Sequence, residues 1–469
     1  MRKTLVSVST MLLLAACSAP DPMVVPDRPL PEAFENGGGD TVAKLPWQEF
    51  FTDEALRSLI AEAVGGNLDL LAAAQRIEIA RAAVRASGGA LLPQVAATAS
   101  AGVRRYGQYT AEWAGNSTTE IRPGQVVPEV LPDYSVGLTA SWEVDLFGRL
   151  RNQRRAALAG HLAAVEGTHA VLASLVSEVA ATYYELLAVD LARDVVARAV
   201  EQREAALEIV RLQKEAGRGT ELAVQQFEAE LFDTRGLATA LEQEIVEVEN
   251  RINLLLGRYP RPVPRSTNAL FAPPPSVGSG IPSALLENRP DVREAEQRLR
   301  AAEFDVAAAR AAFFPSIVLT ADVGYQAFDP RFLFSTPESI TYGIAGGLVA
   351  PLINRAGLEA TFSAASAVQL QALYEYQKAI LTAYTEVVDA LSNLDTAREL
   401  LGRKEEQKAA LLQTVETADL LYRAAKATYL DVLLAQEATL EADLELIEAQ
   451  RRERLATVQI YKALGGGWR

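Results

Sequence analysis

The chain has 469 residues, 49% of them hydrophobic and 22% charged, and a formal net charge of −15. This composition is typical of an ordered, water-compatible protein rather than a disordered or polytopic membrane one, and the acidic balance argues against a nucleic-acid binder. With 1 Cys and 2 His, a metal cluster or disulfide framework is nearly excluded, and we expect no metal or cofactor. We interpret His161 and His169 as incidental, because no set of ligands accompanies them.

The N-terminus has the features of a secretory signal. Arg2 and Lys3 form a short positive region, and the apolar run after them is too short to span a bilayer as a helix. The run ends in "LAAC" at Cys17, which resembles the bacterial lipobox, and Ser18 resembles the pattern sent to the outer membrane. The resemblance implies a signal peptide over 1–16 and lipidation at Cys17. An ordinary signal peptide with an incidental cysteine is the alternative.

Beyond a Pro-rich stretch, the chain is duplicated. "QRIEIARAAVRASGGALLPQVAATASAGV" from Gln75 aligns without gaps with "QRLRAAEFDVAAARAAFFPSIVLTADVGY" from Gln297. The spacing is far longer than that of a solenoid repeat, so it predicts a pseudo-twofold within one unit. The predicted segments are an extended, lipid-anchored tether over 17–46, a first repeat over 47–259, a Pro-dense linker over 260–280 and a second repeat over 281–469.

Each repeat contains two stretches in which apolar and polar residues alternate, the pattern of a strand with one apolar face. In "YSVGLTASWEVDL", Tyr134 and Trp142 fall on the apolar face and Glu143 on the polar one. The two aromatic residues fit a membrane-interface position, with a buried packing role as the alternative. The four predicted strands cover about 94–106, 134–147, 317–326 and 340–348.

The rest of each repeat is predicted to form helices of unusual length. No Pro occurs between Tyr134 and Tyr259 or after Pro351, so each repeat can hold two uninterrupted helices. At ~1.5 Å per residue, the longer ones reach roughly 100 Å. The predicted long helices cover about 148–214, 221–256, 357–422 and 429–464.

Four amphipathic strands raise a problem of closure. A membrane-spanning sheet leaves no open edge, and single-chain outer-membrane barrels begin at about eight strands. If the chain lies in the outer membrane, as Cys17 and Ser18 indicate, its strands are expected to be pooled between subunits. A cyclic trimer would supply about twelve strands, and the helices would project from the membrane as a tube. A soluble sandwich is the alternative.

Several motifs then resemble one family across nearly the whole mature chain. "SWEVDLFGRLR", "ENRPDVREAEQRL", "AARAAFFPSIVLTADVGY" and "LYRAAKATYLDVLLAQEATLEADLELIEAQ" are similar to the TolC/OprM family of outer-membrane efflux channels, in its NodT-like lipoprotein branch. The resemblance implies a mixed α/β membrane protein. Its homotrimer would form a twelve-stranded β-barrel, four strands per subunit, continuous with a long α-helical periplasmic tunnel. It also implies a periplasmic membrane-fusion adaptor, an inner-membrane pump of the RND type, and no catalytic activity.

The resemblance also assigns a periplasmic gate. Tyr422 matches the family's tyrosine that holds the tunnel shut through polar links, and Asp431 matches one position of the family's acidic ring. Leu434 occupies the second acidic position and Ala223 that of a partner carboxylate, so the chain departs from the pattern twice. A Leu434 ring could instead seal by apolar contact. The alternative for Asp431 is a solvated helix charge.

The turns "EAGRGTE" and "RAAKATY" are, by the same resemblance, the tips that dock the adaptor. Two glycines suit helix reversal in the first turn, whereas an alanine replaces the expected glycine in the second. The two cations could meet acidic groups of the adaptor. The residues so assigned are Gly217, Arg218, Gly219, Ala425 and Lys426.

The resulting functional hypothesis is a passive exit duct in the outer membrane. It would be anchored by lipid, with its tunnel in the periplasm, and opened by the adaptor and the pump for export of drugs or other small molecules. One alternative is a periplasmic coiled-coil adaptor or structural lipoprotein. Another is the outer-membrane channel of a type I secretion or metal export system, although 3 Met and 2 His disfavour a copper or silver route.

Overall fold

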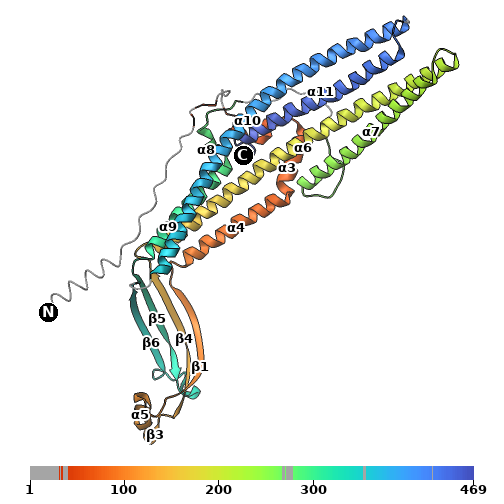
Figure 1. Cartoon of the computed structure of the whole chain (residues 1–469). Helices are drawn as coiled ribbons and strands as arrows, with labels where there is room; N and C mark the ends of the chain where they lie inside the picture. Colours follow the sequence, from red (N-terminus) through yellow and green to blue (C-terminus); the bar gives the residue numbers. More distant parts are fainter. Residues whose placement is uncertain are drawn as a thin grey trace. The chain divides into compact units, whose positions relative to one another are not determined.

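The computed structural model describes residues 31, 33–34, 41–266, 270, 278–351, 355–424 and 426–469 (Figure 1). These residues form two compact units. The strand unit holds Ile79–His161 and Gln297–Leu373. The helical unit holds the described residues before Ile79, together with Leu162–Glu296 and Tyr374–Arg469. The predicted signal peptide, Cys17 and Ala425 lie outside the described residues.

The strand unit contains one four-stranded antiparallel sheet in the order β1-β4-β5-β6 (Figure 1). Each predicted strand is present, with bounds that differ by up to four residues. β4 and β5 are central, so β1 and β6 each pair on one side only within the chain. The strands are β1 Gln94–Arg105, β4 Val130–Val144, β5 Ser316–Ala327 and β6 Ile340–Val349.

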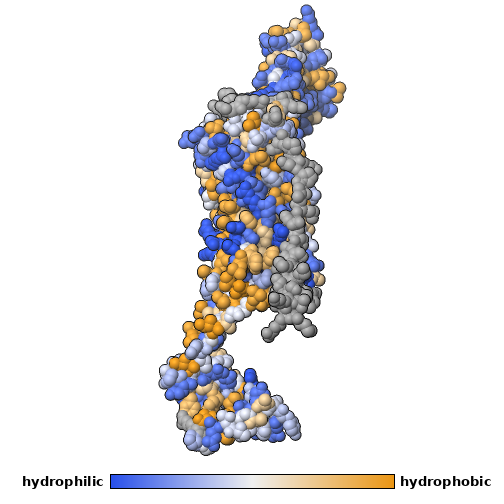
Figure 2. All heavy atoms as spheres, turned by 90° about the vertical axis from the view of Figure 1, so that its left-hand side faces the viewer, coloured by the Kyte–Doolittle hydropathy of each residue, from blue (hydrophilic) through white to orange (hydrophobic). Residues whose placement is uncertain are grey.

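The alternating pattern gives this sheet one apolar and one polar face. In the apolar row, Leu138 of β4 lies opposite Val323 of β5, and they are 50% and 52% exposed. Ile344 of β6 is 87% exposed. In the lower part of Figure 2, apolar side chains lie at the surface of the strand unit. An apolar face this exposed needs a covering, which lipid or another chain can supply.

Short elements fill the connections around the sheet. Between β1 and β4 the chain forms α5 and a two-stranded ribbon of β2 and β3, and η2 lies between β5 and β6. These elements are α5 Ala111–Thr118, β2 Glu120–Arg122, β3 Gln125–Val126 and η2 Pro330–Phe332.

Four long helices form two antiparallel pairs (Figure 1). α6, Arg149–Glu215, has 67 residues and pairs with α7, Glu221–Leu255. α10, Ala356–Arg423, has 68 residues and pairs with α11, Tyr429–Ala463. Their ends lie within two residues of the predicted ones. Ion pairs such as Arg211–Glu228 and Lys404–Glu445, both at 2.6 Å, cross between the paired helices.

Among the described residues, one helix, α6, is long and apolar enough to cross a membrane by length and composition. In the most apolar 18-residue stretch of α6, 56% is buried inside the protein. We therefore assign its apolar side chains to packing within the helical unit.

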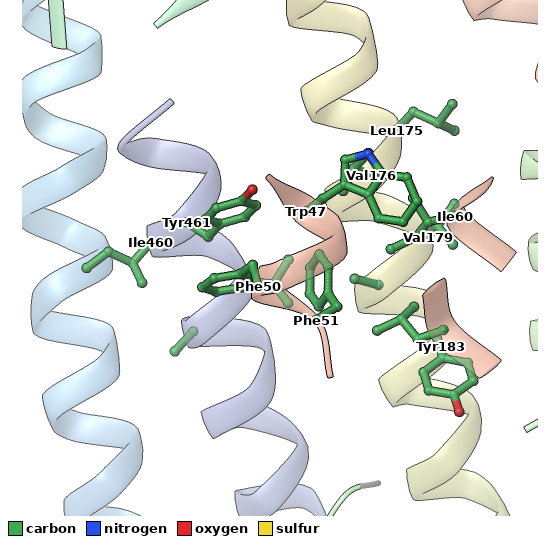
Figure 3. Packing of buried hydrophobic residues seen from close by; sticks show 14 of the residues in the cluster. Trp47, Phe50, Phe51, Ile60, Leu175, Val176, Val179, Tyr183, Ile460 and Tyr461 are labelled. Carbon is green, nitrogen blue, oxygen red and sulfur yellow. The ribbon is translucent and has the colours of Figure 1, made fainter. Parts of the chain in front are cut away.

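The helical unit has an aromatic core where its first residues meet two of the long helices (Figure 3). The ring of Phe50, from α2, stacks on Tyr461 of α11 at 3.9 Å between centroids. The Tyr461 hydroxyl donates to the Leu45 carbonyl at 2.6 Å, and burial raises the pKa of Tyr461 to about 12. Tyr183 of α6 donates to Asp53 at 2.6 Å. Residues 45–53 thereby tie a helix of each repeat to one core.

The remaining helices are shorter. α4 precedes β1 in the first repeat as α9 precedes β5 in the second, which matches the predicted duplication. The bounds are η1 Val42–Lys44, α2 Trp47–Phe50, α3 Glu54–Gly66, α4 Leu68–Gly89, α8 Ala284–Asn288 and α9 Pro290–Ala311.

Candidate functional site

The turn between α6 and α7 is built by two glycines. Gly217 has φ +71°, in the left-handed region, and the Arg218 amide donates to the Gln213 carbonyl at 2.8 Å. This combination is a common way for an α-helix to end. A Cβ on Gly219 would lie 3.0 Å from the Lys214 backbone nitrogen, so this position has little room for a side chain. The side chain of Arg218 is exposed at the end of the turn.

One hydrogen bond of this turn recurs in the turn between α10 and α11. The Lys426 amide donates to the Leu421 carbonyl at 2.9 Å, which corresponds to the Arg218 bond in the first turn. Lys426 is exposed. Within the described part of the chain, neither Arg218 nor Lys426 forms an ion pair. Both cations are therefore available to a partner, as the prediction of docking tips requires.

Tyr422 forms a polar link, but with a partner that the sequence analysis did not identify. The Gln213 side-chain amide of α6 donates to the Tyr422 hydroxyl at 2.6 Å. Tyr422 also packs edge-on against Tyr429, with 4.9 Å between centroids, and Tyr429 lies 4.7 Å from Phe227 of α7. We call Gln213, Tyr422, Tyr429 and Phe227 the latch, since they join α10 and α11 to α6 and α7. Nothing in a single sequence distinguishes Gln213 from the other polar residues of α6.

Asp431 caps the helix that carries it. Its carboxylate accepts hydrogen bonds from the Thr428 amide at 2.7 Å and the Thr428 hydroxyl at 2.6 Å, completing a capping box at the start of α11. These bonds, with the Thr428 side chain contributing most, hold the pKa of the Asp431 carboxyl below its usual value. Asp431 is thus an ionised, exposed group with a local structural role, and its place in an acidic ring stays a prediction.

Leu434 lies on the exposed side of α11. It is 53% exposed, and Leu430, one turn earlier on the same helix, is 45% exposed. Ala223, by contrast, packs against a small buried cluster that contains Phe227 and Leu433. The tip of α11 therefore presents leucines where a second carboxylate was expected. An apolar contact with another copy of the chain would bury them.

The strand-to-helix junction is built around two carboxylates. Asp145 accepts from the Leu150 and Arg151 amides at 3.1 and 2.9 Å, which caps α6, and Gly148 turns the chain at φ +79°. These bonds explain why β4 ends at Val144 rather than at the predicted 147. Glu143 pairs with Arg149 at 2.6 Å. The pair borders an open cavity of about 600 Å³ within the strand unit.

The family model described as "Outer membrane efflux protein" matches residues 59–258 and 281–466. The chain belongs to this family. A pyoverdine export outer membrane protein of Pseudomonas putida, OpmQ, is 32% identical over 97% of this chain and 96% of its own length. The cation efflux system protein CusC of Escherichia coli K12 is 29% identical over 97% of both chains. A toluene efflux pump outer membrane protein of Pseudomonas putida, TtgF, is 31% identical over 100% of this chain and 98% of its own.

Solved structures agree with this assignment. A membrane protein from Pseudomonas aeruginosa superposes with a TM-score of 0.86, at 28% identity, over 96% of this chain and 97% of its own. The open state of the Neisseria gonorrhoeae MtrE outer membrane channel gives a TM-score of 0.84, at 27% identity, over 96% of this chain and 98% of its own.

These relatives confirm the predicted fold class, location and general function. The protein is an outer-membrane efflux channel of the trimeric class that combines a β-barrel with an α-helical tunnel. It acts as an exit duct in efflux across the outer membrane. The soluble-sandwich and coiled-coil-adaptor alternatives are wrong, because family members are outer-membrane channels.

Proposed function

We propose that this channel is the passive exit duct of a tripartite pump that exports small organic molecules. A periplasmic membrane-fusion adaptor and an inner-membrane pump of the RND type would supply the energy and the selection of cargo, and the chain itself would catalyse no reaction. The observation that carries the proposal is the latch at the turns of the long helices. The latch would provide a closure that a partner can reverse without any chemistry in this chain.

The closed state would depend on the latch and on apolar contact. The Gln213–Tyr422 hydrogen bond and the Tyr429–Phe227 contact hold the α10–α11 hairpin against α6 and α7. Leu434 from each subunit would meet at the axis and exclude water. Asp431, beside it, would leave one carboxylate per subunit to attract cations. An adaptor that separates the two hairpins would break this hydrogen bond and this aromatic contact in each subunit, and it would expose Leu433, which is buried in the cluster with Phe227.

The turns are the proposed docking tips. Arg218 and Lys426 are exposed at the ends of the two hairpins and suit an acidic groove of an adaptor. Gly217 and Gly219 shape the first turn. Ala425 occupies the corresponding part of the second turn, outside the described residues.

Lipid at Cys17 would hold each subunit to the inner leaflet through the tether predicted over 17–46, within which Val42 and Ala43 pack into the core of the helical unit. The motif at Cys17 supports this, as does the relative SilC of Salmonella typhimurium, a probable outer membrane lipoprotein that is 28% identical over 98% of this chain. The division into repeats at 47–259 and 281–469, joined by a linker over 260–280, belongs to the same proposal.

One relative favours a second candidate cargo, metal cations, because CusC belongs to a cation efflux system. The chain contains few soft metal ligands, with 3 Met and 2 His, and this scarcity disfavours the export of copper or silver. The described residues also include no group of three or more His, Cys, Asp or Glu that could hold a metal ion. A duct for organic molecules needs no such group.

Deleting the gene in its own host tests the proposal and separates the two cargoes. We expect greater accumulation of a fluorescent hydrophobic dye, unchanged tolerance of copper and silver, and rescue by a plasmid copy. Loss of metal tolerance with unchanged dye accumulation would instead support cation export. Unchanged accumulation and tolerance in every case would contradict a role as an efflux duct for either cargo.

A further inference from the structure

The polar face of the four-stranded sheet is lined mainly by small uncharged residues. In the trimeric barrel of this family the apolar face meets lipid, so the polar face borders the lumen. Directly opposite each other in the central pair are Gly137 and Gly324. The small lumenal residues are Ala96, Thr98, Ser100, Gly102, Ser135, Gly137, Thr139, Ser141, Ser316, Thr320, Gly324, Thr341, Gly343, Ala345 and Gly347.

Four charged side chains interrupt this face, and three of them have partners. Glu143 pairs with Arg149 at 2.6 Å. Asp133 accepts from the Gln326 side-chain amide at 2.8 Å, and Arg104 donates to the Tyr106 hydroxyl at 3.2 Å. Arg104 and Asp133 also lie within electrostatic range of each other, so their opposite charges offset. These three residues therefore add little net charge to the lumen.

The fourth charge, Asp322, has no compensating neighbour. In the described part of the chain, no hydrogen bond or ion pair reaches its carboxylate. It is the seventh of the 12 residues of β5, so it lies near the middle of the strand. An ideal Cβ on Gly343 of β6 would lie 2.7 Å from the Asp322 Oδ1 atom, which shows that the carboxylate occupies the space above that glycine.

We propose that Asp322 determines the charge selectivity of the barrel lumen and makes it prefer cations. One copy from each subunit forms a ring of uncompensated carboxylates at the same level of the barrel. Fixed charges along a water-filled pore raise the local concentration of counter-ions and repel ions of like sign. The inference rests on the proposed function as a duct, because the ring can select ions only if the lumen conducts.

The helical turns offer less for this role than the lumen does. The position where a second acidic ring was expected holds Leu434, and Asp431 is engaged with Thr428. In this chain the barrel therefore carries a selectivity element that the tip has in part lost. Anionic cargo would pass Asp322 against repulsion, whereas cationic and neutral molecules would not.

Single-channel recording in planar bilayers tests the inference. The background is the full-length trimer carrying Tyr422→Ala and Leu434→Ala, which removes the proposed latch and seal so that the pore conducts. The reversal potential in a KCl gradient then gives the ratio of K⁺ to Cl⁻ permeability. Low salt suits the measurement, since the Debye length is about 30 Å at ~0.01 M ionic strength.

Three further substitutions are compared in that background. Asp322→Asn keeps the size and removes the charge. Asp322→Asn with Thr139→Asp moves the charge to the residue directly opposite on β4, at the same level and on the same face. Glu112→Gln, on α5 outside the sheet, removes one carboxylate elsewhere and serves as the matched control.

Asp322→Asn is expected to lower the permeability ratio by about two-fold or more, and the relocated charge to restore it. Glu112→Gln is expected to leave the ratio unchanged. A conducting Asp322→Asn pore with an unchanged ratio would overturn the inference and leave the duct standing. A correctly assembled trimer that conducts no ions in the latch-free background would contradict the duct itself, and the inference with it.

Discussion

Tyr422 forms a hydrogen bond with a residue other than the one that the family resemblance implies. The carboxylate that the family pattern places opposite this tyrosine is replaced by Ala223, and Gln213 supplies the hydrogen bond at 2.6 Å instead. A neutral amide–hydroxyl bond is weaker than a charge-assisted one.

Removing the Tyr422 hydroxyl is expected to weaken the closed state. Tyr422→Phe keeps the ring contact with Tyr429 and loses one hydrogen bond, which contributes about 0.5–1.5 kcal/mol. The closed state therefore loses that amount per subunit, and the open probability in planar bilayers rises. Gln213→Leu is expected to do the same.

A double-mutant cycle provides the control for the latch. If the two side chains act through one bond, Tyr422→Phe combined with Gln213→Leu opens the pore no more than either change alone. Additive effects would show that Tyr422 and Gln213 act separately, and the proposed link between α6 and α10 would be wrong.

Asp431 is expected to stabilise the start of α11 only while it is ionised. Its hydrogen bonds with Thr428 hold the pKa of the Asp431 carboxyl in the folded state below its ordinary value of 3.8. The contribution is therefore complete above the pKa of the unfolded state and disappears as the pH falls through the lower folded-state value. Amide hydrogen exchange over 428–434 is expected to lose protection below about pH 4. Asp431→Asn would then show low protection at every pH, whereas a pH-dependent loss in that variant would point to another group.

At the scale of the elements, the sequence predicted most of the fold because two signals are so clear. Alternation over residues such as Val136, Gly137 and Leu138 identified the strands, and the absence of Pro identified the four long helices. The start of β4 was missed by four residues, because Pro132 and Asp133 interrupt the strand signal. The partners in the latch were not predictable, since a single sequence does not reveal which residues of separate helices face each other.

The first turn depends on the left-handed backbone of Gly217. Gly217→Ala places a Cβ at φ +71°, which costs about 1–2 kcal/mol, so the tip is expected to fray. Tryptic cleavage after Arg218 would then accelerate by about ten-fold. The matched control is Gly236→Ala in α7, where a Cβ meets no atom within 4 Å. That change is expected to stabilise the helix by about 0.5–1 kcal/mol and slow cleavage. Equal cleavage in both variants would contradict a strained turn.

At the scale of the whole molecule, the outer strands explain why the channel needs three chains. β1 and β6 each pair on one side only, and four strands are too few to close a barrel alone. Pairing the β6 edge of one subunit with the β1 edge of the next removes every open edge. The exposed apolar face then forms one continuous band for lipid, and the small polar residues form the lumen.

Two neighbouring residues of β4 test which face meets lipid. Leu138→Arg places a charge on the apolar face, at a cost of about 2–4 kcal/mol per subunit near the bilayer midplane. We therefore expect little folded trimer in isolated outer membranes. Thr139→Arg adds the same side chain one residue later, on the polar face, so the trimer is expected to insert normally. It would also weaken cation preference, because the new charge lies opposite Asp322. Normal assembly of Leu138→Arg with failure of Thr139→Arg would mean that the two faces are assigned the wrong way round.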